Sequence, residues 1–243
     1  MESSVVGSVE IPVELRIRLL CPITVARAGA AVTLPSSRKL RGLLAYLALA
    51  PAPVTRSRLC EMLWDVPNDP RGELRWCLSK LRGVLDQGGQ PRVVTDGDTV
   101  RLDLGGADVD ALAIAAAMQG GVQALPADRV AALAALFAGE FLDGLEIERS
   151  PGFTTWLTAQ RRRLRACHAA LLERLAAAAD GDQALVHLER WLALAPFAVD
   201  RDLVRVIAAL LDIDIYRALQ RAGLSLDQAA AADILRRDDE AAA

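Results

Sequence analysis

The residues whose types and spacing could do chemistry lie in GELRWCLSKLRGVL, residues 72–85, extended one turn back to residue 71. Four polar residues recur there at steps of four, four and three, which places them on one side of a helix: Arg71, Arg75, Ser79 and Arg82. Guanidinium groups suit a polyanion, because each can bind a phosphate or the edge of a guanine through two hydrogen bonds. An isolated charged stripe is more often a solvated face than a binding site. The elements predicted around this helix must therefore decide between the two interpretations.

The same segment carries the apolar pattern of a helix that is buried along one side. Its apolar residues fall at i, i+3, i+4, i+7 and i+11, which is the spacing of one buried stripe: Leu74, Cys77, Leu78, Leu81 and Leu85. Lys80 adds a further basic residue to the part of the helix that lies outside this apolar stripe. The pattern therefore predicts a helix that is packed on one face and basic on another.

A small sheet and two helices are expected ahead of this basic helix. In VELRIRLL, Leu15, Ile17 and Leu19 alternate with arginines, which predicts short antiparallel strands. SSRKLRGLLAYLALAP predicts a helix capped by Ser36, and TRSRLCEMLW predicts a second helix capped by Thr55. DVPNDP then breaks the chain before the basic helix begins.

A hairpin is expected after the basic helix. RVVTDGDTVRL holds two strand-like runs joined by Asp96 and Gly97, a dipeptide that suits a type I′ turn. Strands, three helices and a hairpin in this order describe an α+β winged helix-turn-helix. Arg92 and Arg101, near the hairpin base, are expected to anchor DNA, whereas the carboxylates of the DGD tip would repel phosphates. We expect Trp76 to pack against this hairpin rather than against a DNA sugar.

Composition favours a helix-rich chain of two domains. Of the 243 residues, 53% are hydrophobic and only 4% aromatic, as in helices packed through small and aliphatic side chains, and the length suits two modest domains. No apolar run reaches the roughly 18 residues that span a bilayer. The opening MESSVVGSVE lacks the features of a secretory signal. We therefore expect a cytoplasmic protein with no membrane partner.

No recognisable catalytic or metal-binding constellation is found in the sequence. His168 and His187 have no partners at catalytic or metal-ligand spacing, and a GxxxxGK[ST] phosphate loop is absent. The four cysteines are scattered singly and are expected to be buried free thiols: Cys21, Cys60, Cys77 and Cys167. We therefore expect no enzyme activity, no cofactor and no metal.

The balance of charge changes sign along the chain. Residues 1–103 hold 14 Lys and Arg against 11 Asp and Glu, whereas the remainder holds 14 against 20. This split is typical of a nucleic-acid reader followed by a protein-interaction domain, although the excess of basic residues is small.

The second half is predicted to be all helical. Ala- and Leu-rich helical patterns, separated by Gly, Pro or Asp-Gly breaks, cover residues 108–118, 126–138, 153–179, 183–194 and 201–211. Stacked helical hairpins of this kind leave a concave surface suited to protein contact. The basic run RRRLR, residues 161–165, is expected to be a solvated face rather than a second DNA contact.

These segments resemble a known family of bacterial regulators. LRIRLLCPITVARAGAAVTLPSSRKLRGLLAYLAL, TRSRLCEMLW, LRWCLSKLRGVL and VVTDGDTVRL resemble the OmpR-type winged-helix domain of the Streptomyces antibiotic regulatory protein (SARP) family, over about residues 14–103. The chain beyond residue 103, above all GEFLDGLEIERSPGF, is similar to that family's bacterial transcriptional activation domain (BTAD), which is built of tetratricopeptide-like helical hairpins.

Three departures from the family pattern stand out, the first of which is the acidic DGD tip, where related hairpins offer arginine. Cys21 occupies a position where the family usually has glycine. From residue 212 onward the chain does not follow the family's last hairpin, although Ser225 and Gln228 have the spacing of a capping box.

The resemblance implies a transcriptional regulator with a winged-helix domain over residues 1–103 and an all-α, tetratricopeptide-like domain over residues 104–243. It implies an activator that binds direct repeats in double-stranded promoter DNA as a homodimer, inserts residues 71–85 in the major groove and contacts RNA polymerase holoenzyme. The alternative is a protein-interaction scaffold whose winged helix has lost DNA binding, as the acidic tip and the low basic charge would permit.

Overall fold

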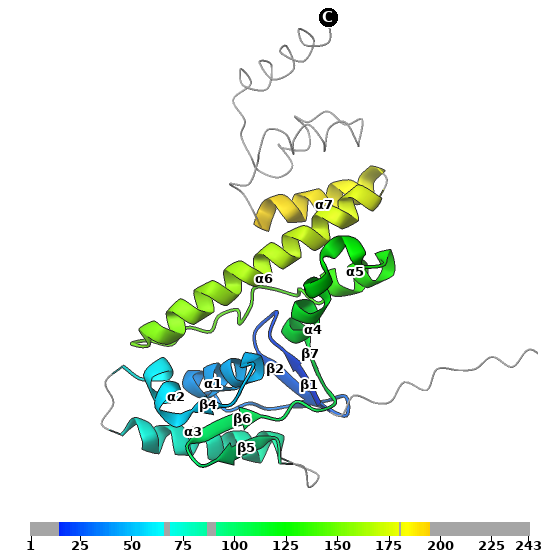
Figure 1. The fold of residues 1–243 in the computed structure, drawn as a ribbon. Coiled ribbons are helices and arrows are strands. Elements are labelled where there is room, and N and C mark those ends of the chain that lie inside the picture. The colour runs from blue at the N-terminus through cyan, green and yellow to red at the C-terminus, as the bar shows by residue number, and fades with distance from the viewer. Residues whose placement is uncertain (1–14, 66–68, 87–90, 180, 195–243) are drawn as a thin grey trace, which may run out of the picture. The chain divides into compact units, whose positions relative to one another are not determined.

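The computed structural model describes residues 15–65, 69–86, 91–179 and 181–194 (Figure 1). It has a mixed N-terminal region of strands and helices and a helical C-terminal region. The described residues form two compact units. The first contains those up to Gln119 together with Leu136–Leu164, and the second contains Gly120–Ala135 and those from Arg165 onward. The domain boundary expected at residues 103 and 104 stays a prediction, because packing units and independently folding domains need not coincide.

The first unit opens with the expected antiparallel strands. These are β1 (Leu15–Arg18), β2 (Thr24–Arg27) and β3 (Ala30–Val32). Leu15 and Ile17 are fully buried, so the alternation seen in the sequence is confirmed. A fourth strand, β7 (Ala107–Val109), pairs with β1 in parallel and gives the order β3-β2-β1-β7. Sequence patterning missed β7 because three residues are too short to show a period.

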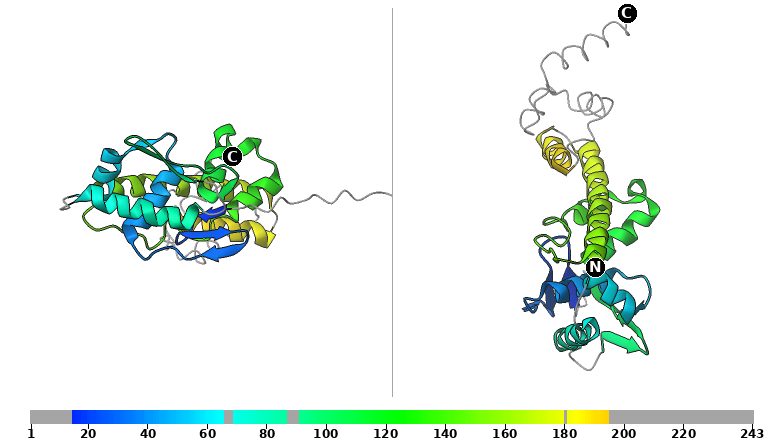
Figure 2. Two further views of the ribbon diagram at one scale, coloured as in Figure 1. Left: turned by 90° about the horizontal axis from the view of Figure 1, so that it is seen from below. Right: turned by 90° about the vertical axis from the view of Figure 1, so that its left-hand side faces the viewer.

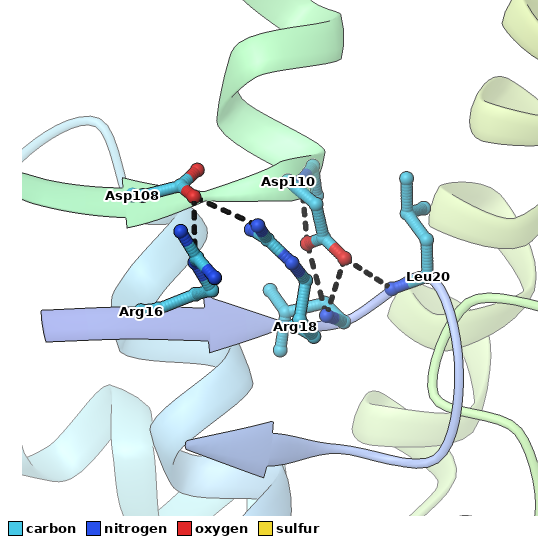
Figure 3. Close-up of polar contacts among 7 residues, drawn as sticks. Arg16, Arg18, Leu20, Asp108 and Asp110 are labelled. Carbon is cyan, nitrogen blue, oxygen red and sulfur yellow. Dashed lines mark hydrogen bonds and ion pairs between the residues drawn. The ribbon is translucent and has the colours of Figure 1, made fainter. Parts of the chain in front are cut away.

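Two aspartates join β7 to β1 (Figure 3). Asp108 accepts hydrogen bonds from Arg16 Nε at 3.1 Å and Arg18 Nη2 at 2.8 Å, and the bond to Arg18 is the main cause that lowers the pKa of Asp108. Asp110 is fully buried at the start of α4 (Asp110–Ala117). Its carboxylate accepts from the backbone N–H groups of Leu19 and Leu20 at 2.9 Å. These bonds offset the cost of burying the carboxylate, although burial still raises the pKa of Asp110.

Three helices follow in the expected order, with short strands among them. These elements are α1 (Arg38–Leu49), β4 (Val54–Thr55), α2 (Arg56–Leu63) and α3 (Pro70–Leu85). Thr55 caps α2 as predicted, since its hydroxyl accepts from the N–H of Arg58. The cap of α1 is Ser37 and not Ser36, because Ser37 directly precedes the helix and its Oγ accepts from the N–H of Leu40.

The expected hairpin is formed by β5 (Val93–Asp96) and β6 (Thr99–Leu102). Asp96 pairs with Thr99, so the two-residue turn is Gly97 and Asp98 rather than Asp96 and Gly97. Of these two turn residues only Gly97 has a positive φ, at 51°. The predicted type I′ turn is therefore wrong, because a type I′ turn needs positive φ at both central positions, whereas a type II′ turn needs it only at the first. β4 completes a three-stranded sheet, β4-β6-β5.

The segment around residues 139–153 closes the core of the first unit. The N–H groups of Gly139 and Leu142 donate to the carbonyls of Leu20 and Leu19. Phe153, near the start of α6 (Pro151–Ala178), is fully buried against Gly42 of α1, where an added Cβ would lie 3.1 Å from its ring. The helical region of the first unit is thus completed by residues that follow the hairpin in the chain.

The second unit is helical. The expectation that residues 104–243 are all helical, with a helix over 108–118, is wrong at β7, after which α4 begins at Asp110. Besides the later part of α6 the second unit contains α5 (Ala127–Ala134) and α7 (Gly181–Leu194), preceded by a 3₁₀ turn at Val122–Ala124. A second 3₁₀ turn, Met118–Gly120, follows α4. Within this unit Arg174 of α6 donates to Gln123 Oε1 at 2.7 Å and to the carbonyl of Leu125 at 3.2 Å. The predicted helix at residues 201–211 and the capping box at Ser225 lie outside the described residues.

The four cysteines are free thiols, of which Cys60 and Cys77 are buried and Cys21 and Cys167 are half-buried. None of the described helices is both long enough and apolar enough to cross a membrane.

Candidate nucleic-acid interface

The apolar stripe of α3 packs into the core of the first unit, as predicted. Its five members are all at most 2% exposed, and they are Leu74, Cys77, Leu78, Leu81 and Leu85. The helix begins at Pro70, and the carboxylate of the capping residue Asp69 accepts from the N–H of Gly72 at 2.7 Å. Proline suits the first helical position because that N–H would have no intrahelical partner.

The C-terminal end of α3 is held from two sides. Arg27 of β2 donates from Nη2 to the carbonyls of Val84 at 2.9 Å and Leu85 at 2.8 Å, which are carbonyls left open at a helix end. Asp86 accepts from the backbone N–H groups of Arg92 at 2.7 Å and Val93 at 2.9 Å, next to β5. Since one end is held by the N-terminal sheet and by the hairpin, α3 has a fixed direction within the unit.

The outward face of α3 is uncovered by any other described element of the first unit, as both views show (Figures 1 and 2). Five exposed side chains project from it, Arg71, Arg75, Trp76, Ser79 and Lys80, and the exposed carboxylate of Glu73 lies beside them. Four of the five are predicted site residues, and the structure brings these four together on one helix. We call these five residues the α3 face.

Arg82 is part of the predicted polar stripe but turns toward the hairpin. Its guanidinium is half-buried and donates from Nη2 to Thr95 Oγ1 at 3.2 Å and from Nε to the carbonyl of Val93 at 3.4 Å. In this structure Arg82 joins α3 to β5. Any effect of Arg82 on ligand binding is therefore at least partly indirect, because Arg82 helps to position the hairpin.

Arg92 and Arg101, expected as anchors at the hairpin base, differ in exposure. Arg92 is only 4% exposed, and its Nη1 donates to the carbonyls of Asp103 and Gly105, both at 3.2 Å. The expectation that Arg92 anchors DNA does not fit this burial, because its guanidinium already donates hydrogen bonds to backbone carbonyls of the protein. Arg101 is exposed, and its Nη1 lies 3.6 Å from a carboxylate oxygen of Asp103.

The nearby carboxylates are engaged by the protein itself. Glu73, the one acidic residue of α3, accepts from the indole of Trp64 and lies 3.5 Å from Lys39 Nζ of α1. Asp69 caps the helix and lies 3.7 Å from Arg75 Nη2. Both ion pairs are exposed and therefore weak, so Arg75 remains available to a second anion. The α3 face is cationic around an aromatic side chain.

Trp76 contradicts the expectation that it packs on the hairpin. It is 49% exposed, one of two exposed large hydrophobic residues in the described part of the chain, and Lys80 Nζ lies 5.9 Å from its ring centroid. Sequence reasoning placed it on α3 but misjudged its burial. Its position five residues before the buried Leu81, on the side opposite the apolar stripe, could have shown the exposure.

The hairpin tip carries negative charge, as the sequence indicated. Asp96, Gly97 and Asp98 are all exposed. The tip is therefore a poor partner for a phosphate backbone, whereas the α3 face is a good one.

The second unit holds the two histidines. Burial lowers the pKa of His168 to about 4, with a smaller contribution from the positive charge of Arg190, and the same two causes lower the pKa of His187. Both rings therefore favour the neutral form. Among the residues that the structure describes, no three His, Cys, Asp or Glu side chains gather as a metal site would require.

The fold of the chain is similar to that of a solved structure. Comparison with protein-family models gives no match, and no curated protein matches. The chain is similar to the structure of Mycobacterium tuberculosis EmbR in complex with low affinity phosphopeptide, with a TM-score of 0.52 and 21% sequence identity. The similarity covers 88% of this chain and 66% of that one, so this chain spans about two thirds of the EmbR chain's length. At this identity the likeness concerns the fold alone.

Proposed function

We propose that the chain is a sequence-specific DNA-binding transcriptional regulator of the SARP type. The observation that carries the proposal is the α3 face: Arg71, Arg75 and Lys80 project from one exposed side of a helix whose other side is buried and whose end is fixed. A rigid basic helix at the edge of a unit can enter the major groove, where arginine reads guanine and lysine binds phosphate. In this proposal strands, three helices and the β5-β6 hairpin act as a winged helix-turn-helix.

The family resemblance and the likeness to EmbR support the same function. By that resemblance the regulator is a cytoplasmic activator that acts as a homodimer on direct repeats in promoter DNA, reading DNA with residues 1–103 and contacting RNA polymerase holoenzyme through a tetratricopeptide-like region within residues 104–243. Activation would follow from linkage, since a DNA-bound protein presents its second surface to polymerase at a high effective concentration. No catalytic step, cofactor or metal is part of the proposal.

A protein-interaction scaffold is the competing function. The acidic tip at Asp96 and Asp98 and the burial of Arg92 favour it, because both reduce the phosphate contacts that a hairpin could make. The scaffold still has to account for Arg71, Arg75 and Lys80 on one exposed helix face, where the cations outnumber the neighbouring carboxylates of Asp69 and Glu73.

Selection of DNA from a random duplex pool by the full chain separates the two functions. The regulator should enrich a repeated motif, and Arg75→Ala should lower the affinity for the enriched duplex by about 1 to 3 kcal/mol if Arg75 reads a base. Arg163→Ala is the matched control, because Arg163 is an exposed arginine on α6, away from the α3 face, and its loss removes the same charge. A pool without an enriched motif, or equal effects of the two substitutions, would support the scaffold.

Spacing variants of the enriched duplex test the dimer. Two recognition helices lie on one side of DNA when repeats are about 10 to 11 base pairs apart, one helical turn. Linkage of two weak sites can then raise the avidity by about 10² to 10⁴. A shift of half a turn should abolish that gain in a gel-shift titration, and an unchanged affinity would contradict dimeric binding to direct repeats.

A further inference from the structure

The most exposed aromatic side chain of the first unit stands in the middle of its basic helix. Trp76 is 49% exposed, whereas the indole of Trp64 is 4% exposed and that of Trp156 is half-buried among Tyr46, Phe141 and Phe153. Leaving an indole in water forgoes the free energy that its burial would provide, which amounts to a few kcal/mol for a large aromatic side chain. An exposed tryptophan on a rigid helix is therefore a candidate contact residue.

Small residues surround Trp76 on its own face. Gly72, Ser79 and Gly83 lie four residues before, three after and seven after it, which places all three beside it on the side opposite the apolar stripe. A Cβ added at Gly83 would meet nothing within 4 Å. At Gly72 the Asp69 carboxylate occupies this space, since an added Cβ would lie 2.1 Å from its Oδ2. The helix is therefore slim on the Ser79 and Gly83 side of the indole, where a flat or grooved partner can approach the ring closely.

Charge restricts the kind of partner. Arg71 and Arg75 lie on one side of the indole and Lys80 on the other, with Lys80 Nζ 5.9 Å from the ring centroid. The two nearest carboxylates are engaged by the protein itself, Glu73 by Trp64 and Lys39 and the capping Asp69 by the N–H of Gly72 and by Arg75. A partner that covers Trp76 must therefore be rich in negative charge and must offer an apolar spot between its charges.

The major groove of an A·T pair has both properties. Phosphates line its edges, and the thymine 5-methyl group is the apolar feature of its floor. We propose that Trp76 packs its indole against a thymine methyl group, so that the α3 face reads an A·T pair beside the position read by Arg75. The inference rests on the proposed function and adds the chemical group that Trp76 recognises.

A second copy of the chain is the alternative occupant of this face. The approach of two such faces would bring three cations of each copy together, Arg71, Arg75 and Lys80. The two neighbouring carboxylates, Asp69 and Glu73, are fewer and are already engaged within each copy, so like charges disfavour this approach. The charges of the α3 face therefore favour DNA as the partner.

Replacement of thymine by uracil tests the inference with the full chain. The probe is the duplex enriched from a random pool, compared with duplexes in which one thymine at a time is replaced by deoxyuridine, which removes only the methyl group. One position should bind wild-type protein about fourfold more weakly, the effect of one buried methyl. In Trp76→Ala the same replacement should change nothing, because the partner of the methyl is gone. Trp76→Ala should also keep the wild-type melting temperature, since the side chain is exposed.

Tryptophan fluorescence gives a second readout. The difference between wild type and Trp76→Phe isolates the emission of Trp76, which should be open to acrylamide quenching in the free protein and protected at saturating DNA. Equal uracil effects in wild type and Trp76→Ala, or unchanged quenching in the complex, would overturn the role of Trp76 while DNA binding stands. An enriched motif without a thymine in the selected sites would do the same. A pool without enrichment would overturn the proposed function together with the inference, and loss of dimerisation in Trp76→Ala without DNA would assign the residue to a protein interface instead.

Discussion

Ser150 donates its hydroxyl hydrogen to the backbone carbonyl of Leu63 over 2.7 Å, although 87 residues separate the two in the chain. Ser150 is 3% exposed and lies directly before α6, and Leu63 is the last residue of α2. The bond joins the helix that precedes the candidate recognition helix to a segment well beyond the hairpin. Within the first unit, the region that would read DNA and the start of α6 therefore share one core.

Ser150→Ala should lower the free energy of unfolding by about 1 to 3 kcal/mol, because it removes the donor and leaves a buried carbonyl without that partner. Thr158→Ala is the matched control, since the Thr158 hydroxyl bonds to the carbonyl of Thr154 at an exposed site on α6, where the change should stay within about 0.5 kcal/mol. Denaturant titration followed by tryptophan fluorescence measures both. Equal stabilities of the two variants would show that the Ser150 bond adds nothing.

Truncation should separate the first unit from the expected 1–103 domain. A chain ended after residue 103 lacks three residues that contact its core. Asp110 accepts from the N–H of Leu19, Ser150 donates to the carbonyl of Leu63, and Phe153 covers Gly42. We expect this fragment to unfold without a cooperative transition, because large apolar surfaces of its core are left open. A chain ended after residue 164 keeps these contacts and should unfold cooperatively. A sharp transition in the shorter fragment would instead support a domain boundary at residues 103 and 104.

Two helical glycines should respond to alanine in opposite directions. At Gly42 of α1 an added Cβ would lie 2.6 Å from Ile147 Cδ1 and 3.1 Å from the ring of Phe153, so Gly42→Ala should cost about 1 to 3 kcal/mol by overpacking. At Gly83 of α3 the added Cβ would meet nothing within 4 Å, so Gly83→Ala should raise stability by about 0.5 to 1 kcal/mol through helix propensity alone. Shifts of the same sign in thermal unfolding would contradict this packing of Ile147 and Phe153.

Local patterns in the sequence predicted most of the elements but not the contacts between distant segments. The stripe from Leu74 to Leu85 set the buried side of α3, and Thr55 marked the start of α2, because period and capping act over a few residues. Asp110 was missed, since its partners at Leu19 and Leu20 lie about 90 residues away and a buried carboxylate has no local signature. The burial of Arg92 was missed for the same reason, because its carbonyl partners are set by the fold of the chain after β6.

Arg82 and Arg75 should separate positioning from direct contact. Arg82→Ala removes the bonds to Val93 and Thr95 and should lower stability by about 1 kcal/mol, whereas Arg75→Ala, at an exposed site, should leave the melting temperature unchanged. On the enriched duplex Arg75→Ala should change the preferred base, whereas Arg82→Ala should weaken all sequences about equally. Calorimetry and competition binding measure the two effects. Loss of stability in Arg75→Ala would show that this side chain is part of the packing.

His168 should make the second unit sensitive to mild acid. Burial, aided by the positive charge of Arg190, lowers the pKa of His168 from 6.5 to about 4 in the folded chain. Between these two values the unfolded chain binds more protons than the folded one, so stability falls as the pH falls through 6.5 toward 4. Each pKa unit corresponds to about 1.4 kcal/mol, and the partial exposure of the ring reduces this to about 1 kcal/mol between pH 7 and pH 5. His168→Gln, which does not titrate, should lose less stability than wild type between pH 7 and pH 5. A variant that also carries His187→Gln should lose still less, since the pKa of His187 is lowered by the same causes. Denaturant titrations at pH 7 and pH 5 measure the difference, and an identical pH dependence in wild type and His168→Gln would show that the ring is not buried in its neutral form.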